Sequence, residues 1–319
     1  MFGYSFYYVL NMSIMASVVM MILLVLRFVL KKWLSKSMLV VLWVVVLVRL
    51  IIPFSIESPI SIGNILGEST IKSIKVSDYI PDEVPIDLTF SNYVQLANDY
   101  VPISFERSKT AEYFDVVGMI WMSGLLLIGC YFLVVIFMLR QLKKDACVVN
   151  DLSESKVKCY KTDRVDTPMV IGIIKPFILM PIDDHNKLNE QLNKVILLHE
   201  KAHIRRKDNL WKLIFGIALC IHWFNPFIWF LSRIVSQDIE LACDERVLKG
   251  LKPNERKYYG AVLLDYASKE KLHATAFGNS NLKNRIYAII NFKQKSLYMI
   301  AVTSFVCILL SYVLLTNPT

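Results

Sequence analysis

Four long apolar runs dominate the pattern of hydrophobic and polar positions along the chain. Each run is long enough for the roughly 20 residues that a membrane-spanning helix needs. The sequence therefore predicts a mostly α-helical membrane protein with four transmembrane helices. Two are expected at about 4–30 and 33–52, within a first segment 1–52, a third at 116–139, and the fourth, with a short outer tail, in 296–319.

Between the third and fourth runs, residues 140–295 have the mixed patterns of an α+β domain. β-type patterns occupy 157–160 and 168–181, and the prolines in the second stretch suit the edge of a sheet. An edge strand beside a catalytic site can hold an extended peptide by β-addition, although such a sheet can equally well just cover a helix. The stretch 188–206 has apolar residues at helical spacing.

A further apolar run covers residues 210–231 and is interrupted by Asn225 and Pro226. Proline cannot continue a helix, and each half is too short to cross a bilayer comfortably. We therefore expect a hairpin that dips into the membrane or lies against it. His222 in this run is expected to be a hydrogen-bonded core histidine rather than a metal ligand.

The distribution of charge predicts the orientation of the chain. The first two apolar runs and their connection carry five basic residues and no acidic ones, whereas the loop 53–115 carries four basic and ten acidic residues. Basic loops stay on the cytoplasmic side of a membrane. We therefore expect the loop 53–115 and both termini outside, and residues 140–295 in the cytoplasm. Arg49, near the end of its span, is expected to extend to the outer interface, and a buried functional charge is the less favoured alternative.

Composition agrees with a membrane protein, because 55% of the residues are hydrophobic. The net charge of +9 could suggest a nucleic-acid partner. The chain has no nucleic-acid-binding motif, and attraction to anionic lipid headgroups explains the charge more simply. The lipid bilayer is therefore an expected partner and nucleic acid is not.

The predicted helix 188–206 contains an H-E-x-x-H motif, from His199 to His203. Two histidines four residues apart share one face of a helix, so both imidazoles can bind one Zn²⁺ ion. Glu200 is then placed to take a proton from a water bound to that zinc. The motif alone also occurs by chance, on solvated surface helices, and the helical context strengthens it here.

A zinc hydrolase needs a third protein ligand and an open fourth position. Glu240 and Asp244 share a helix face, which predicts Glu240 as the ligand and Asp244 as the carboxylate that orients a histidine. Asp208 is a second candidate for such orientation. The alternative, a solvated acidic face, fits poorly with the apolar residues around them.

Two further residue types near these positions leave alternatives open. Cys243 could approach the metal, but a small packed side chain is its expected role. Tyr258, Tyr259 and Tyr266 could each steady an oxyanion, although tyrosines at helical spacing more often serve packing.

The combined motifs resemble the BlaR/MecR-type family of membrane metallopeptidases, the β-lactam sensor-transducers and their antirepressor relatives. The residues that carry the resemblance are Pro168–Gly172 with Lys175–Ile178, His199–Asp208, His222–Trp229 and Glu240–Glu245. The likeness covers most of the chain, including the four apolar runs. It implies a gluzincin-like zinc metallopeptidase domain over 140–295, in a multi-pass protein of a bacterial-type plasma membrane. It also implies the roles assigned above to His199, His203, Glu240, Glu200 and Asp244.

By this resemblance, the chain would respond to an outside signal by cleaving itself near residues 276–285, a cytosolic transcriptional repressor, or both, in a pathway of antibiotic resistance. A homodimer is also compatible with it. The family's penicillin-binding sensor domain, which would follow the last span, is not in this sequence. The alternatives are a truncated copy and a relative that senses through the outer loop or through a separate protein.

Two other functions remain open from the sequence. One is a quality-control zinc protease that degrades many damaged membrane proteins. The other is a receptor or scaffold with a structural zinc, against which Glu200 argues, because a structural site has no use for a base. The favoured function is a signalling zinc metalloendopeptidase.

Overall fold

The computed structural model describes residues 2–31, 33–52, 58, 109–144, 146–149, 157–165, 167–182, 190–270 and 278–316. These residues are mostly helical, with one small sheet. They form two compact units. The first holds Met1–Cys130, Phe215–Val235 and Ser296–Thr319, and the second holds Tyr131–Ile214 and Ser236–Lys295. Most of the predicted outer loop 53–115 lies outside the described residues.

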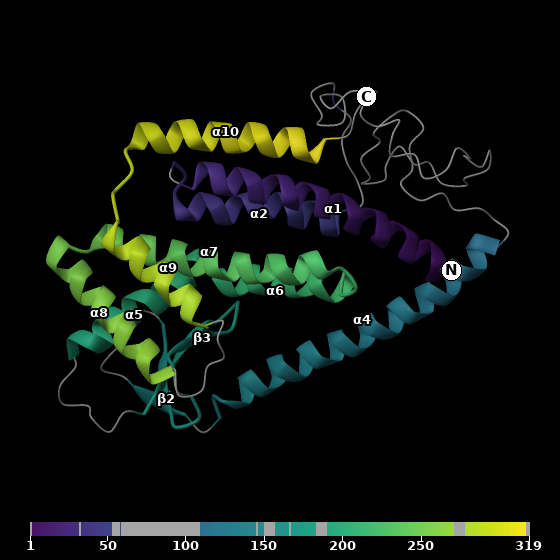
Figure 1. Cartoon of the computed structure of the whole chain (residues 1–319). Helices are drawn as coiled ribbons and strands as arrows, with labels where there is room; N and C mark the ends of the chain where they lie inside the picture. Colours follow the sequence, from purple (N-terminus) through teal and green to yellow (C-terminus); the bar gives the residue numbers. More distant parts are fainter. Residues whose placement is uncertain are drawn as a thin grey trace. The chain divides into compact units, whose positions relative to one another are not determined.

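Helices α1 (Phe2–Leu30), α2 (Lys36–Ile51) and α10 (Leu297–Leu315) belong to the first unit, where α2 contacts both of the others (Figure 1). The first part of α4 (Lys109–Gln141) lies there too. Within α1, α4 and α10, three segments are long and apolar enough to cross a membrane: Ser5–Leu30, Tyr113–Gln141 and Tyr298–Leu315. They coincide with three of the four predicted spans. Helix α2 has 16 residues, about 24 Å of helix, so its crossing stays a prediction.

The expectation for Arg49 is wrong. Its side chain does not reach an interface but is fully buried in the first unit. Its Nε donates to the carbonyl of Leu314, and its Nη2 donates to the carbonyls of Leu314 and Thr316, at 3.0–3.2 Å. These carbonyls lie at the carboxyl end of α10, where a helix leaves acceptors unsatisfied and its dipole favours a cation. Arg49 therefore caps the last helix.

The apolar run 210–231 forms two helices, as the hairpin prediction requires. Helix α6 (Asp208–Ile221) ends before α7 (Pro226–Gly250), where Pro226 takes the first helical position and Asn225 Oδ1 accepts from the amide of Phe227 at 2.9 Å. His222 is fully buried and its Nε2 donates to the carbonyl of Leu50 at 2.8 Å. It is a hydrogen-bonded core histidine, as predicted.

The sheet of the second unit has the strand order β1-β2-β4-β3. Its strands are β1 (Cys147–Val149), β2 (Cys159–Thr162), β3 (Met169–Ile171) and β4 (Phe177–Pro181). Strand β2 pairs parallel with β4, and the other two pairs are antiparallel. Strand β3 is at an edge, as predicted, but β4 is central. Its proline stands at the last position, so no amide is missing from the middle of the ladder.

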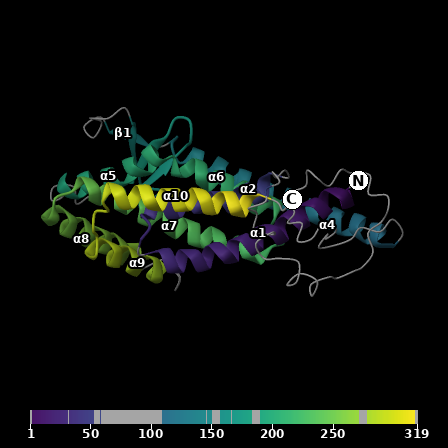
Figure 2. The same cartoon turned by 90° about the horizontal axis from the view of Figure 1, so that it is seen from above.

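Helices α5 (Glu190–Arg206), α8 (Pro253–Glu270) and α9 (Gly278–Ile290) complete the second unit with parts of α4, α6 and α7. Figure 2 shows α8 and α9 side by side, in contact with each other. Buried Ile196 and Leu197 of α5 pack with Ile178 of β4 and Val262 of α8. The sheet and α8 therefore fix the helix that carries the H-E-x-x-H motif.

Candidate metal centre

Three donor atoms predicted to bind one ion lie close together in the second unit. His199 Nε2 and His203 Nε2 are 3.1 Å apart. Glu240 Oε2 lies 3.5 Å from the first and 3.6 Å from the second. Zinc–nitrogen and zinc–oxygen distances of about 2.0–2.1 Å place neighbouring ligands of a tetrahedron about 3.4 Å apart. The spacing of these three atoms therefore fits one tetrahedral metal ion.

Two helices supply these donors. His199 and His203 are one turn apart on α5, and Glu240 comes from α7. Both imidazoles are buried, and the Glu240 side chain is 30% exposed. A site with three protein donors and a partly open carboxylate leaves room for a further ligand.

Asp208 reaches His203 because the chain breaks between α5 and α6. Five residues of continuous helix would turn Asp208 about 140° away from His203. Lys207 instead has a φ of 57°, in the left-handed region, and Asp208 begins the next helix. Asp208 Oδ2 therefore lies 2.7 Å from His203 Nδ1, and Arg206 Nε binds the same carboxylate at 3.1 and 3.2 Å.

His199 is held through its other ring nitrogen in a similar way. His199 Nδ1 is 2.9 Å from the hydroxyl of Tyr259, which donates to Asp244 Oδ1 at 2.5 Å. Asp244 Oδ1 also lies 3.4 Å from His199 Nδ1. The structure thus brings Asp244 to His199 as the sequence suggested, and it adds Tyr259. Because its hydroxyl hydrogen points to Asp244, Tyr259 is an orienting residue rather than an oxyanion donor.

Arg285 of α9 completes this network. Its Nε and Nη2 each donate to Asp244 at 2.8 Å, and its Nη1 lies 3.6 Å from Glu240 Oε2. Lys212 Nζ lies 3.9 Å from the other Glu240 oxygen, Oε1. The sequence did not point to either cation, since neither belongs to a metal-binding motif.

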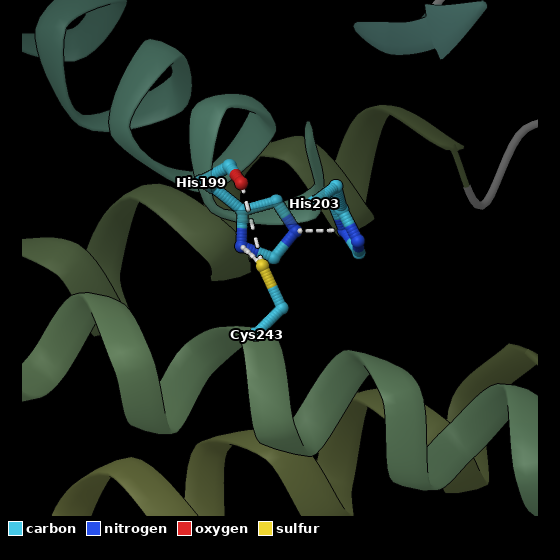
Figure 3. A group of neighbouring side chains, drawn as sticks. All are labelled: His199, His203 and Cys243. Carbon is cyan, nitrogen blue, oxygen red and sulfur yellow. Dashed lines mark hydrogen bonds between the residues drawn. The ribbon is translucent and has the colours of Figure 1, made fainter. Parts of the chain in front are cut away.

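Cys243 offers an alternative third donor, shown in Figure 3. One donor atom each from His199, His203 and Cys243 lie within 4.8 Å of one another. The Cys243 sulfur, however, lies 3.6 Å from Nδ1 of His199 and 3.3 Å from its carbonyl oxygen. A metal bound through Nδ1 would displace the Tyr259 hydroxyl. Glu240, which faces the Nε2 pair, is therefore the better third donor, and fully buried Cys243 has the packing role expected for it.

The charges of the site follow from these contacts. Burial lowers the pKa of His203, but hydrogen bonds, first of all to Asp208, raise it to about 11. Burial would raise the pKa of Glu240, but hydrogen bonds to both histidines and the charge of Arg285 hold it well below its usual range. These contacts favour an ionised Glu240 carboxylate beside a protonated His203 imidazole when no metal is bound. A bound cation would replace the proton on the nitrogen that it binds.

A cavity of about 350 Å³ opens beside these groups. Apolar side chains from α5 and α8 form part of its wall, and edge strand β3 contributes Met169 and Val170. Asn209 binds the carbonyls of Val170 and Gly172, both at 3.0 Å, and so ties the start of α6 to this edge. The cavity is wide enough for a side chain of a bound molecule.

Glu200 also lines this cavity, and only 7% of its surface is exposed to solvent. No hydrogen bond or ion pair joins its carboxylate to another of the described residues. A carboxylate this deeply placed normally has a partner. Glu200 is therefore available to a water or ligand in the cavity.

The predicted self-cleavage region 276–285 is described only in part. Residues 276 and 277 lie outside the described residues, and Gly278 onward is the first half of α9. Arg285, at its end, is bound to Asp244. Cleavage in 278–285 would require this half of the helix to unfold.

Comparison with known proteins supplies a family. Residues 7–289 match the family described as BlaR1 peptidase M56. A regulatory protein BlaR1 of Bacillus licheniformis is 27% identical over 215 residues, or 61% of this chain and 36% of that protein. A methicillin resistance mecR1 protein of Staphylococcus aureus is 26% identical over 204 residues, or 58% and 35% of the two chains.

A regulatory protein BlaR1 of Staphylococcus aureus is similar over a longer stretch. It is 24% identical over 303 residues, which is 88% of this chain and 49% of that protein. The chain thus spans between about a third and a half of the length of these relatives.

Proposed function

Because this chain belongs to the BlaR1 peptidase M56 family, we propose that it is an integral-membrane zinc metalloendopeptidase of a signalling pathway. The observation that carries this proposal is the triangle of His199 Nε2, His203 Nε2 and Glu240 Oε2, with sides of 3.1–3.6 Å. Two imidazoles and one carboxylate are the ligands of zinc hydrolases, whereas structural zinc sites are mostly closed by four protein ligands.

The proposed mechanism assigns a task to each group of the site. A bound Zn²⁺ would supply a Lewis acid that lowers the pKa of water to about 7 and polarises a peptide carbonyl. Glu200 accepts the proton of the attacking water on its carboxylate and passes it to the leaving amine. Asp208 and the Tyr259–Asp244 pair hold the two imidazoles with their Nε2 atoms toward the ion.

The wider assignment follows the family. We propose four spans, with residues 33–52 as the second, both termini outside and a gluzincin-like protease domain in the cytoplasm. The substrates would be a transcriptional repressor and a site in this chain near 276–285. The names of the relatives, regulatory proteins and a methicillin resistance protein, support a signalling role rather than general quality control.

A variant of Glu200 tests the catalytic assignment. The full chain, purified in detergent with zinc, should cleave itself or a supplied repressor, and Glu200→Gln should lower that rate at least about a hundredfold. Zinc binding should be unchanged, because Glu200 is not one of the three donors. The matched control is Lys194→Gln on an exposed position of the same helix, which should behave as wild type.

The same experiment separates the alternatives. Equal cleavage by wild type and Glu200→Gln would contradict the assigned base. Zinc binding without cleavage in wild type would favour the structural site. Cleavage of many unfolded membrane proteins at similar rates would favour quality control.

A further inference from the structure

The side chain of Arg285 contacts the candidate ligand Glu240 and the buried carboxylate of Asp244. We propose that Arg285 is a positioning residue of the metal centre, so that helix α9 is part of the site and its docking sets the affinity for the metal. This inference rests on the metal site proposed above. It assigns to α9 a task other than that of a cleavage site.

The guanidinium of Arg285 is fixed on one side by two parallel bonds. Its Nε and Nη2 donate to the two oxygens of Asp244, both at 2.8 Å, and the Arg285 side chain is 18% exposed. Bidentate pairs of this kind define an orientation as well as a distance. The remaining nitrogen, Nη1, is thereby held 3.6 Å from Oε2 of Glu240, the oxygen that faces the imidazoles.

The same contact reaches a second ligand through Asp244. This carboxylate is 1% exposed, and it accepts from the hydroxyl of Tyr259, which lies 2.9 Å from His199 Nδ1. Without Arg285, the Asp244 carboxylate would lose the two bonds that fix its orientation, and it could turn away from Tyr259. Such a turn would disturb the hydrogen bonds that orient His199. Arg285 therefore supports two of the three ligands, His199 and Glu240.

Apolar contacts decide whether Arg285 is in place. Ile289 belongs to the buried cluster that includes Tyr259 and Cys243, and Ile286 and Phe292 pack against this cluster. The Phe292 ring also lies 4.7 Å from the guanidinium of Arg256. Residues 291–296 then lead along the chain from α9 to α10, the last candidate span. A force on α10 can therefore reach α9 through the backbone, and undocking of α9 would withdraw Arg285 from the site.

Coupling between two events is reciprocal. If docking of α9 favours metal binding, metal binding must favour docking of α9 by the same factor. The inference thus predicts two independent effects, one on zinc affinity and one on the stability of α9. Neither requires that a substrate be known.

The affinity test uses the full chain in detergent, titrated with zinc against a chromophoric chelator. Arg285→Gln should weaken zinc binding at least about tenfold, as loss of a group that orients a ligand typically does. Arg285→Lys, which keeps the charge but cannot form the two parallel bonds, should weaken it less. The control Lys283→Gln, at an exposed position of the same helix, should stay within about twofold of wild type.

The second test measures amide hydrogen exchange in residues 282–292. Zinc should slow exchange there in wild type and in Lys283→Gln, but not in Arg285→Gln. A folded Arg285→Gln protein that binds zinc as tightly as wild type would overturn the inference. Equal slowing of exchange by zinc in Arg285→Gln and in wild type would also overturn it. If Arg285→Gln does not fold, the same two measurements are made on Arg285→Lys, and wild-type values in that variant overturn the inference. A wild-type chain that binds no zinc would instead overturn the metal site itself.

Discussion

At the scale of single residues, the site depends on side chains that bind the Nδ1 atoms of the two imidazoles, opposite the proposed metal. His203 has Asp208 at 2.7 Å, and His199 has Tyr259 and Asp244. Each contact fixes which ring nitrogen carries the proton and leaves Nε2 for a metal. The two histidines are therefore set by independent partners, so one partner can be removed without the other.

Asp208→Asn tests the support of His203. The amide keeps the size of the side chain but removes its charge, so we expect zinc affinity to fall about 10- to 100-fold. Equilibrium titration with a competing chelator measures the change. Asp163→Asn makes the same chemical change at an exposed position and should leave affinity within about twofold. Equal affinities of Asp208→Asn and wild type would mean that Arg206 or the backbone orients His203.

The sequence predicted the three donors and the carboxylates of Asp208 and Asp244, but not Arg285 or the orienting role of Tyr259. His199, His203 and Glu240 follow from helical spacing, which is a local property. Tyr259 and Arg285 come to Asp244 from 15 and 41 residues away, on helices without a metal motif. The bend that brings Asp208 to His203 depends on the left-handed backbone conformation of Lys207. The sequence does not predict this conformation, because glycine is the usual residue there.

At the scale of the helices, the break between α5 and α6 gives a prediction of its own. Lys207 has a backbone φ of 57°, and this left-handed conformation costs a residue with a Cβ atom about 1–2 kcal/mol. Replacement by glycine removes this strain, which is larger than the entropy that glycine loses on folding. Lys207→Gly should therefore raise the melting temperature slightly. The same change at exposed Lys257, inside α8, should lower stability by about 1 kcal/mol. If both variants lose the same stability, Lys207 is not strained.

Arg49 gives a second prediction at this scale, and it is also the residue whose position the sequence pattern predicted wrongly. A basic residue near the end of a span was expected at the interface, but the free carbonyls at the end of α10 bind it 265 residues away in sequence. Arg49→Gln should leave these acceptors poorly satisfied and destabilise the protein by about 1–3 kcal/mol. Thermal unfolding in detergent measures this effect. Exposed Arg246→Gln is the control, and equal melting temperatures of the two variants would contradict the capping role.

At the scale of the whole molecule, the proposed orientation has the metal site on the cytoplasmic side of the membrane. The exposed thiol of Cys147, in the second unit, can report this. A membrane-impermeant maleimide added to intact cells should leave Cys147 unmodified. The same reagent should modify Cys147 after the membrane is opened. An Asn317→Cys variant should react in intact cells. Peptide mass spectrometry identifies the sites, and modification of Cys147 in intact cells would reverse the proposed orientation.

The proposed zinc site consists of His199, His203 and Glu240. X-ray absorption at the zinc edge, on the full chain loaded with one equivalent of zinc, distinguishes these ligands from Cys243. We expect only nitrogen and oxygen neighbours at about 2.0–2.1 Å, in wild type and in Cys243→Ser alike. A sulfur neighbour at about 2.3 Å that disappears in Cys243→Ser would contradict it and make Cys243 the third ligand.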